Sequence, residues 1–304
     1  MKILFMGTPE TAAVSLEELL RAGHEIVGVF TRKDKPVGRK QVITPSPVKQ
    51  LALQNNLKVF QPASLTDETL QEEVRALAAD VGVVVAYGRI LPKSFLSIPA
   101  MGCVNLHFSL LPQYRGAAPV QWAVLNGDTD TGLSVIQMDE GLDTGDILST
   151  CTMEVGANQT SGEMQEIASV LGARLLAQTV ADMAEGKITP VPQQGQPVLA
   201  PVLDKKMAQM DFSLPAQTLH NLVRGCNPWP LAWFEHQGKR IKVMHVLHMA
   251  ELSGKPGEVL LTKPLTIGCA QGALQLEEVV PEGSRAMRGF EWAAGRRLQA
   301  GKIL

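Results

Sequence analysis

The chain has 304 residues, of which 45% are hydrophobic and 19% charged, so it is long enough for a large apolar core and for two domains. Its net charge of −2 gives no global sign of a nucleic-acid partner, and its four widely separated cysteines argue against a zinc site or a disulfide framework. Because no run of about 18 apolar residues occurs and "MKILFMGTPE" turns polar early, we expect neither a membrane span nor secretion, and we take the protein to be cytoplasmic.

Short apolar strands alternate with amphipathic helices through the first half of the chain. The predicted strands are 2–6, 25–30, 58–60, 80–87, 102–108 and 131–138, and the predicted helices are 9–23, 45–56, 66–79 and 118–127. Thr66 is expected to cap the third of these helices. The run "DVGVVVAY" at 80–87 has almost no polar face, which is typical of a parallel sheet covered on both sides. We therefore predict an α/β fold with a Rossmann-like, doubly wound, mostly parallel sheet.

The strand predicted at 102–108, "GCVNLHF", carries two polar residues where the others are apolar. Asn105 and His107 are two positions apart, so their side chains share one face near the carboxyl end of the strand, where ligands of such sheets gather. An amide donor beside an imidazole suits an oxyanion that forms at a carbonyl carbon. No further residue nearby has metal-site spacing. A packing role for His107 is the alternative that these residues leave open.

The loop after the next strand, "MDEGLDTGDIL", supplies carboxylates. Its acids are Asp139, Glu140, Asp143 and Asp146. We expect the strand at 131–138 to run parallel to its neighbour, so that this loop reaches the same cleft. Asp143 lies between two glycines that permit close backbone approach, whereas Asp139 or Asp146 could cap a turn. A carboxylate near His107 would favour the charged imidazole, but spacing alone does not choose Asp143.

Several motifs resemble the formyltransferase family that uses 10-formyltetrahydrofolate, and within it the members that formylate methionine on initiator tRNA. They occur in the family's order along nearly the whole chain, as "FMGTPE", "PSPVK", "AYGRILP", "SLLPQYRGAAP", "GLDTGDIL" and "NPWPLAW". The resemblance implies transfer of the formyl group from 10-formyltetrahydrofolate to the α-amino group of methionine on initiator methionyl-tRNA. It implies a catalytic trio of Asn105, His107 and Asp143, with no metal and no covalent enzyme intermediate.

The same resemblance implies a folate pocket. Its expected residues are Gly88, Arg89, Ile90 and Leu91, mostly through backbone groups, with Ser109, Leu110, Leu111 and Pro112. A flat pterin ring needs apolar walls with a few hydrogen bonds at its edge, which these residues can supply. The alternative is that the leucines only pack the loops.

A long basic loop follows the second strand. The stretch "TRKDKPVGRKQVITPSPVK" holds five cations between residues 32 and 40, and loops of this length are usually functional or disordered. The family carries a tRNA-contacting insertion here, with an important arginine at the position of Arg39. We expect Arg39 and Lys40, together with Lys205 further along the chain, to contact tRNA phosphates. A solvated charge run is the alternative.

A stretch rich in Pro, Gly and Gln divides the chain after the helix predicted at 161–186. We predict a catalytic domain at 1–186, a linker at 187–206 and a C-terminal domain at 207–304. Where the linker meets the C-terminal domain, Val202, Lys206 and Met207 replace a lysine and two acids of the family pattern. Lys205 is kept.

The C-terminal part has the pattern of a small β-barrel. Its predicted elements are a helix at 214–226, a hairpin turning at Gln237 and Gly238, and strands at 257–262, 265–270 and 273–280. The resemblance implies an OB-like domain that binds tRNA. Eleven Lys and Arg against eight Asp and Glu after residue 206 fit that role.

Other functions keep part of this pattern. A sugar-nucleotide or glycinamide-ribotide formyltransferase would retain the trio and the folate pocket, but it should lack the basic loop and the basic barrel. A formyltetrahydrofolate hydrolase would use water as the acceptor. A catalytically idle RNA-binding protein would not need Asn105, His107 and Asp143.

Overall fold

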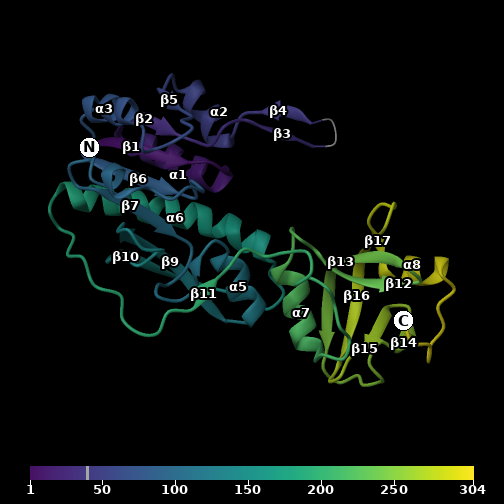
Figure 1. Cartoon of the computed structure of the whole chain (residues 1–304). Coiled ribbons are helices and arrows are strands. Elements are labelled where there is room, and N and C mark those ends of the chain that lie inside the picture. The colour runs from purple at the N-terminus through teal and green to yellow at the C-terminus, as the bar shows by residue number, and fades with distance from the viewer. Residues whose placement is uncertain (39–40) are drawn as a thin grey trace. The chain divides into compact units, whose positions relative to one another are not determined.

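The computed structural model describes residues 1–38 and 41–304, which form two compact units (Figure 1). Each unit gathers several stretches of chain. The first comprises Met1–Gly116, Thr131–Met153 and Gln165–Leu199, and the second comprises Ala117–Asp130, Glu154–Met164 and Ala200–Leu304. The division into segments 1–186, 187–206 and 207–304 stays a prediction.

A mostly parallel sheet forms the centre of the first unit. Its strands are β1 Lys2–Gly7, β2 Glu25–Phe30, β5 Val59–Phe60, β6 Val81–Val85, β7 Cys103–His107, β9 Asp130–Gln137 and β10 Ile147–Glu154. They lie in the order β10-β9-β7-β6-β1-β2-β5, and the strands from β7 to β5 are parallel. This order confirms the predicted Rossmann-like fold.

The strand β9 runs opposite to the direction that we predicted. It pairs antiparallel with β7, so that Asn105 lies opposite Ile136 and His107 opposite Ser134. Apart from its first and last residues, β9 is buried, a pattern that either strand direction can satisfy. The expectation that the following loop leaves from the carboxyl edge of a parallel strand was therefore wrong.

Helices and two short strands complete the first unit. The helices are α1 Glu10–Arg21, α2 Pro47–Gln54, α3 Glu68–Ala76, α4 Lys93–Leu96 and most of α6 Ser161–Ala184, and the short strands β8 Arg115–Gly116 and β11 Leu199–Ala200 pair with each other. The Thr cap predicted for α3 was wrong by one residue. The carboxylate of Asp67 accepts from Leu70 N–H at 3.1 Å, while the hydroxyl of Thr66 bonds to that of Ser64. An ionised oxygen makes the stronger cap.

The helix α6 covers part of the sheet (Figure 1). Gly172 on this helix faces Leu106 of β7, where a Cβ atom would approach the leucine side chain to 2.9 Å. Within the described part of the chain, α6 alone is long and apolar enough to cross a membrane by length and composition, and half of its most apolar window is buried. Core helices pass the same test.

The long basic loop contains a hairpin that we did not predict. Its strands are β3 Lys35–Val37 and β4 Val42–Thr44, paired antiparallel. The base of the loop is fastened to the first unit, because Arg32 donates to the carbonyl of Gly88 and Lys49 bonds to Asp34 at 2.7 Å. Arg39 and Lys40 lie outside the described residues.

The second unit contains an antiparallel sheet, as predicted. Its strands are β12 Ala232–His236, β13 Lys239–Met249, β14 Val259–Thr262, β15 Leu265–Gly268, β16 Ala273–Pro281 and β17 Met287–Arg288, in the order β12-β13-β16-β15-β14 with β17 beside β16. Its helices are α5 Pro119–Asn126, α7 Ala216–Gly225 and α8 Gly289–Gly295. The β12–β13 turn falls at Gln237 and Gly238, both with positive φ, which confirms that hairpin. We did not predict β17 and α8.

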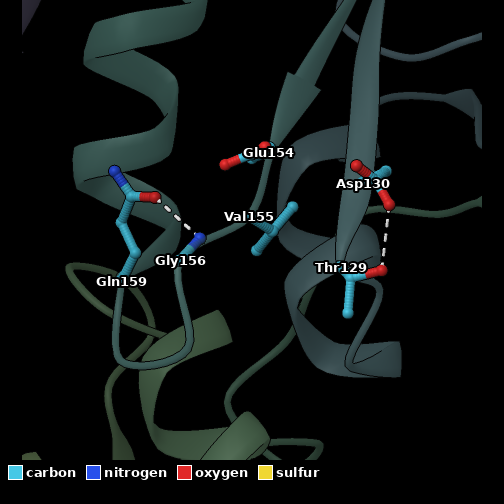
Figure 2. Close-up of a pocket in the computed structure, with 6 residues that line it drawn as sticks. All are labelled: Thr129, Asp130, Glu154, Val155, Gly156 and Gln159. Atoms are coloured by element: carbon cyan, nitrogen blue, oxygen red, sulfur yellow. Dashed lines mark hydrogen bonds between the residues drawn. The ribbon is translucent and has the colours of Figure 1, made fainter.

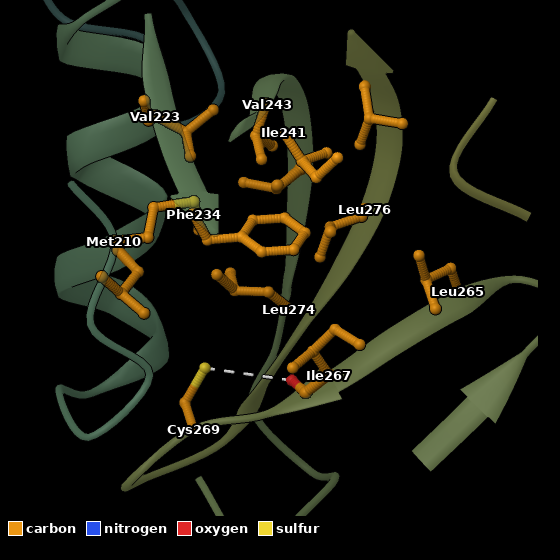
Figure 3. Close-up of a cluster of buried hydrophobic side chains, with 14 of the residues drawn as sticks. Met210, Val223, Phe234, Ile241, Val243, Leu265, Ile267, Cys269, Leu274 and Leu276 are labelled. Atoms are coloured by element: carbon orange, nitrogen blue, oxygen red, sulfur yellow. Dashed lines mark hydrogen bonds between the residues drawn. The ribbon is translucent and has the colours of Figure 1, made fainter. Parts of the chain in front are cut away.

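Apolar side chains from the sheet and from α7 form the core of the second unit (Figure 3). Phe234 lies at its centre, edge-on to Trp292 with ring centroids 5.7 Å apart. Val223 of α7 and Leu274 of β16 belong to the same cluster. The burial of this cluster gives the C-terminal stretch a core of its own.

Candidate active site

The central strand β7 fixes the two polar residues that the sequence singled out. Asn105 lies opposite Val84 of β6 on one side and Ile136 of β9 on the other, so its backbone is held from both sides. Asn105 is half-buried and His107 is 5% exposed. Their spacing of two places both side chains on the same face, as predicted.

The imidazole of His107 has a defined orientation. Its Nε2 atom lies 2.9 Å from the carbonyl oxygen of Tyr114, and since a carbonyl only accepts, Nε2 carries the hydrogen. Its Nδ1 atom lies 3.6 Å from Oδ2 of Asp143, slightly beyond direct hydrogen-bond distance. The second ring nitrogen, Nδ1, therefore faces a carboxylate.

Asp143 is held where it can face His107. Its Oδ2 atom accepts from Gly116 N–H at 2.8 Å, and its side chain is 14% exposed. Because β9 is antiparallel, the loop after Gln137 starts level with Val104 and must turn back along β7 to reach His107. The next turn requires a glycine, since a Cβ atom on Gly145 would overlap the carbonyl of Gln137.

The other three acids of this loop have different surroundings. Asp139 accepts from Gly141 N–H at 3.0 Å and from the Thr144 hydroxyl at 2.6 Å, so it caps the turn. Glu140 forms an exposed ion pair with Lys93, and Asp146 is exposed. Of the four predicted candidates, only Asp143 is paired with His107 among the described residues.

Two residues that we did not predict form a hydrogen-bonded chain to the Asp143 loop, which Gln193 contacts directly. Gln193, from the predicted linker, donates from Nε2 to the carbonyls of Asp143 and Gly145, each at 2.8 Å. Arg115 donates from Nη2 to Oε1 of Gln193 at 2.6 Å. Gln193 lies in a stretch whose composition predicts only an extended linker, so no local sequence signal could have found it.

The expected folate residues after β6 divide into exposed and internally bonded ones. Ile90 is 91% exposed, whereas Leu91 is buried in the core beside Phe95. Arg89 donates to the carbonyls of Pro62 and Ala63 at 2.9 and 2.5 Å, so its guanidinium braces the loop. Gly88 has a φ of +75°, which favours glycine.

The expected folate residues after β7 form a loop tied to β9. Ser109 accepts at its carbonyl from the Ser134 hydroxyl at 2.7 Å, and Leu111 N–H donates to the same hydroxyl at 3.1 Å. Leu110 is half-buried, Leu111 is buried, and the peptide bond between Leu111 and Pro112 is cis. Since β6 and β7 are parallel neighbours, this loop and the Gly88–Leu91 loop leave from the same edge of the sheet.

Of the expected tRNA contacts, only Lys205 lies within the described residues. It is exposed, and its carbonyl accepts from Nε1 of Trp233 at 2.9 Å. The guanidinium of Arg240 lies 4.0 Å from the centroid of the same indole. Trp233 thus contacts the backbone of Lys205 and the guanidinium of Arg240 on the second unit.

A shallow hollow of about 530 Å³ lies in the second unit (Figure 2). Its walls are Thr129, Asp130, Glu154, Val155, Gly156 and Gln159, none of them a predicted site residue. Within residues 1–38 and 41–304, no group of three or more His, Cys, Asp or Glu side chains is arranged to hold a metal ion.

An amide and an imidazole on a central strand of a Rossmann-like sheet, with a carboxylate that faces the imidazole, form a site suited to stabilising an oxyanion. Residues 1–180 match the family described as formyl transferase, and residues 202–297 match its C-terminal domain. The chain belongs to the formyl transferase family, as the sequence motifs predicted, and it is an enzyme.

Similar proteins cover the full length of the chain. A methionyl-tRNA formyltransferase of Myxococcus xanthus is 43% identical over 303 residues, which is 99% of this chain and 96% of the relative. One of Alkaliphilus oremlandii is 41% identical over 308 residues, covering 100% and 99%. Among solved structures, an N-formyltransferase of Helicobacter canadensis in complex with folinic acid and dTDP-3-aminofucose has a TM-score of 0.69 at 18% identity, covering 91% and 99%. That likeness supports the fold.

Proposed function

We propose that this enzyme transfers the formyl group of 10-formyltetrahydrofolate to the α-amino group of methionine on initiator methionyl-tRNA, in the cytoplasm. The product, N-formylmethionyl-tRNA, would serve translation initiation. The observation that carries the chemistry is the pairing of His107 with Asp143. His107 lies on the same strand as Asn105. Full-length identity above 40% to relatives named for this reaction supports the choice of acceptor.

The proposed catalytic trio acts on the oxyanion of the reaction. The amine nitrogen attacks the formyl carbon, and the carbonyl oxygen becomes negatively charged in the tetrahedral intermediate. The amide of Asn105 and protonated Nδ1 of His107 stabilise that charge. Asp143 stabilises the imidazolium and, through water, accepts the proton that leaves the amine. The bond from the formyl carbon to N10 then breaks, and N10 takes up a proton as tetrahydrofolate leaves.

The two loops at the carboxyl edge of β6 and β7 are the proposed folate site. Exposed Ile90 supplies an apolar face for the pterin, and the backbone around Gly88 can approach the ring closely because glycine has no side chain. Leu110 of the second loop is only half-buried and supplies a further apolar contact. No metal takes part in the proposed steps.

The proposed tRNA contacts are Arg39, Lys40 and Lys205, and the C-terminal domain at 207–304 is the proposed OB-like tRNA-binding domain. Lys205 and Arg240 support this assignment, because both are exposed and exposed cations suit a phosphate backbone. In the sequence, Arg39 and Lys40 fall between β3 and β4.

The test compares acceptors at a fixed concentration of 10-formyltetrahydrofolate. The arms are charged initiator methionyl-tRNA, free methionine, an amino-sugar nucleotide and water alone. Formylation of methionyl-tRNA alone supports the proposal. Formylation of the sugar nucleotide would replace it with a small-molecule transferase, and release of formate without any acceptor would make the protein a hydrolase.

A further inference from the structure

The loop that carries Asp143 needs an external support. Asp143 has a φ of +51°, a left-handed conformation that is uncommon for a residue other than glycine. The neighbours Leu142 and Thr144 are exposed, so the loop has little apolar packing of its own. The bond from Gly116 N–H holds the carboxylate, but it does not hold the loop backbone.

Gln193 supplies that support through the backbone. Its Nε2 atom donates to the carbonyls of Asp143 and Gly145, on either side of Thr144, each at 2.8 Å. Its Oε1 atom accepts from Nε and Nη2 of Arg115, at 3.1 and 2.6 Å. A guanidinium only donates and a carbonyl only accepts, so the amide fits in one orientation.

Backbone hydrogen bonds made by residues before and after Gln193 in the chain hold this segment in place. Val191 exchanges two hydrogen bonds with Ile147, at 2.8 and 2.9 Å, just after the Asp143 loop ends. Further on, Val198 accepts from Arg115 N–H at 2.8 Å. Gln193 therefore lies on a segment anchored both to β10 and to the strand that carries its guanidinium partner.

Arg115 connects this support to the proposed catalytic trio. The residue before it, Tyr114, accepts from Nε2 of His107, and the residue after it, Gly116, donates to Asp143. Three consecutive residues thus contact His107, Gln193 and Asp143 in turn. A displacement of any one of these contacts would change the distance between the imidazole and the carboxylate.

We propose that Gln193, oriented by Arg115, is a positioning residue that holds Asp143 at its working distance from His107. The inference rests on the proposed function of the trio. Gln193 does not need to contact either substrate, so its loss should act on turnover rather than on substrate binding. Each of its two bonds to the loop is worth up to about tenfold in an equilibrium.

Two variants and a neighbouring control test the role. Gln193→Ala removes both bonds. Gln193→Glu keeps the size and the acceptor for Arg115 but turns a second oxygen toward two carbonyls. Exposed Gln194 provides the control, Gln194→Ala. We expect kcat to fall between about tenfold and a hundredfold in both Gln193 variants, with KM for each substrate within about threefold and with Gln194→Ala unchanged.

A double variant separates positioning from a merely structural role. If Gln193 acts through Asp143, the variant Gln193→Ala/Asp143→Asn should be no slower than Asp143→Asn, because the support has nothing left to position. If the losses of kcat in Gln193→Ala and Asp143→Asn were fully additive in the double variant, the inference would be overturned. Normal kcat in both Gln193 variants, with a reduced kcat in Asp143→Asn, would also overturn the inference about Gln193. Normal kcat in Asp143→Asn would instead reject the proposed trio.

Hydrogen exchange supplies a readout that does not depend on the acceptor. In Gln193→Ala the amides of the 138–146 loop should exchange faster, while those of β6 and β7 stay unchanged. Unchanged exchange in the loop would overturn the inference.

Discussion

Replacement of Asp143 by asparagine is the most direct test of the pairing with His107. The change removes the charge and little else, because asparagine tolerates the positive φ of +51° and can still accept from Gly116 N–H. Any loss of activity then reports the electrostatic contribution. The fold should be unaffected.

The distance sets the expected magnitude. Two unit charges 3.6 Å apart attract by about 4 to 5 kcal/mol at an effective dielectric constant of about 20. Since about 1.4 kcal/mol corresponds to a tenfold change in rate, the upper bound is about three orders of magnitude. Water and the amide dipole recover part of that, so we expect kcat to fall between about a hundredfold and a thousandfold.

The assay is formylation of methionyl-tRNA, measured as kcat. Asp146→Asn, on an exposed acid of the same loop, is the matched control and should retain normal kcat. A loss of less than about fivefold in Asp143→Asn would refute the pairing.

The remaining predictions concern the donors, the basic loop and acid stability. Asn105→Ala and His107→Ala should each lower kcat by at least about a hundredfold with the fold retained by circular dichroism, and a near-normal rate in either would contradict the oxyanion assignment. Arg39→Ala should raise KM for charged tRNA and flatten the slope of log kcat/KM against log salt by about 0.7 to 0.9, with folate KM unchanged. The control for Arg39→Ala is Arg21→Ala on α1. Equal salt slopes in the wild type, Arg39→Ala and Arg21→Ala would exclude the loop from tRNA binding. Burial, followed by the charge of Arg224, lowers the pKa of His220 below its ordinary value of 6.5, so the folded protein keeps it neutral while the unfolded chain protonates it. Stability should therefore fall as pH drops below about 6.5, and His220→Gln should make that dependence shallower by up to about 1.4 kcal/mol per pH unit. Urea unfolding followed by tryptophan fluorescence measures this in the second unit, which holds all four tryptophans, and an unchanged slope would contradict it.

Local patterns were enough to predict most helices and strands and the positions of Asn105 and His107. Period-two alternation and buried Val-rich runs depend only on neighbours in sequence. The direction of β9 depends instead on which strand it pairs with, and its buried run suits either direction. The short strands β3, β4 and β17 were missed because strands of two or three residues carry too little periodicity.

The choice of Asp143 was correct as a member of the His107 pair, but the reason that we gave for its placement was wrong. A parallel β9 would have delivered the loop directly to the carboxyl edge of β7. The actual strand ends level with Val104, and the loop returns along β7 only because other residues hold it there. The family motif pointed to the acid that faces His107, but it does not contain the geometry that positions this acid.

The linker illustrates why composition misses such supports. Its Pro, Gly and Gln content indicates a chain with few apolar anchors, and that is accurate for the side chains around Gln193, which are mostly exposed. The segment is nevertheless fixed, because Val191 and Val198 bond through their backbones to residues 44 and 83 positions earlier. Backbone bonds are available to every residue type except at the proline nitrogen, so they leave no trace in composition. A polar residue between two backbone-bonded positions can donate a well-oriented hydrogen bond at little entropic cost, since most of its backbone freedom is already lost. The proposed role of Gln193 follows from that arrangement and not from its residue type alone.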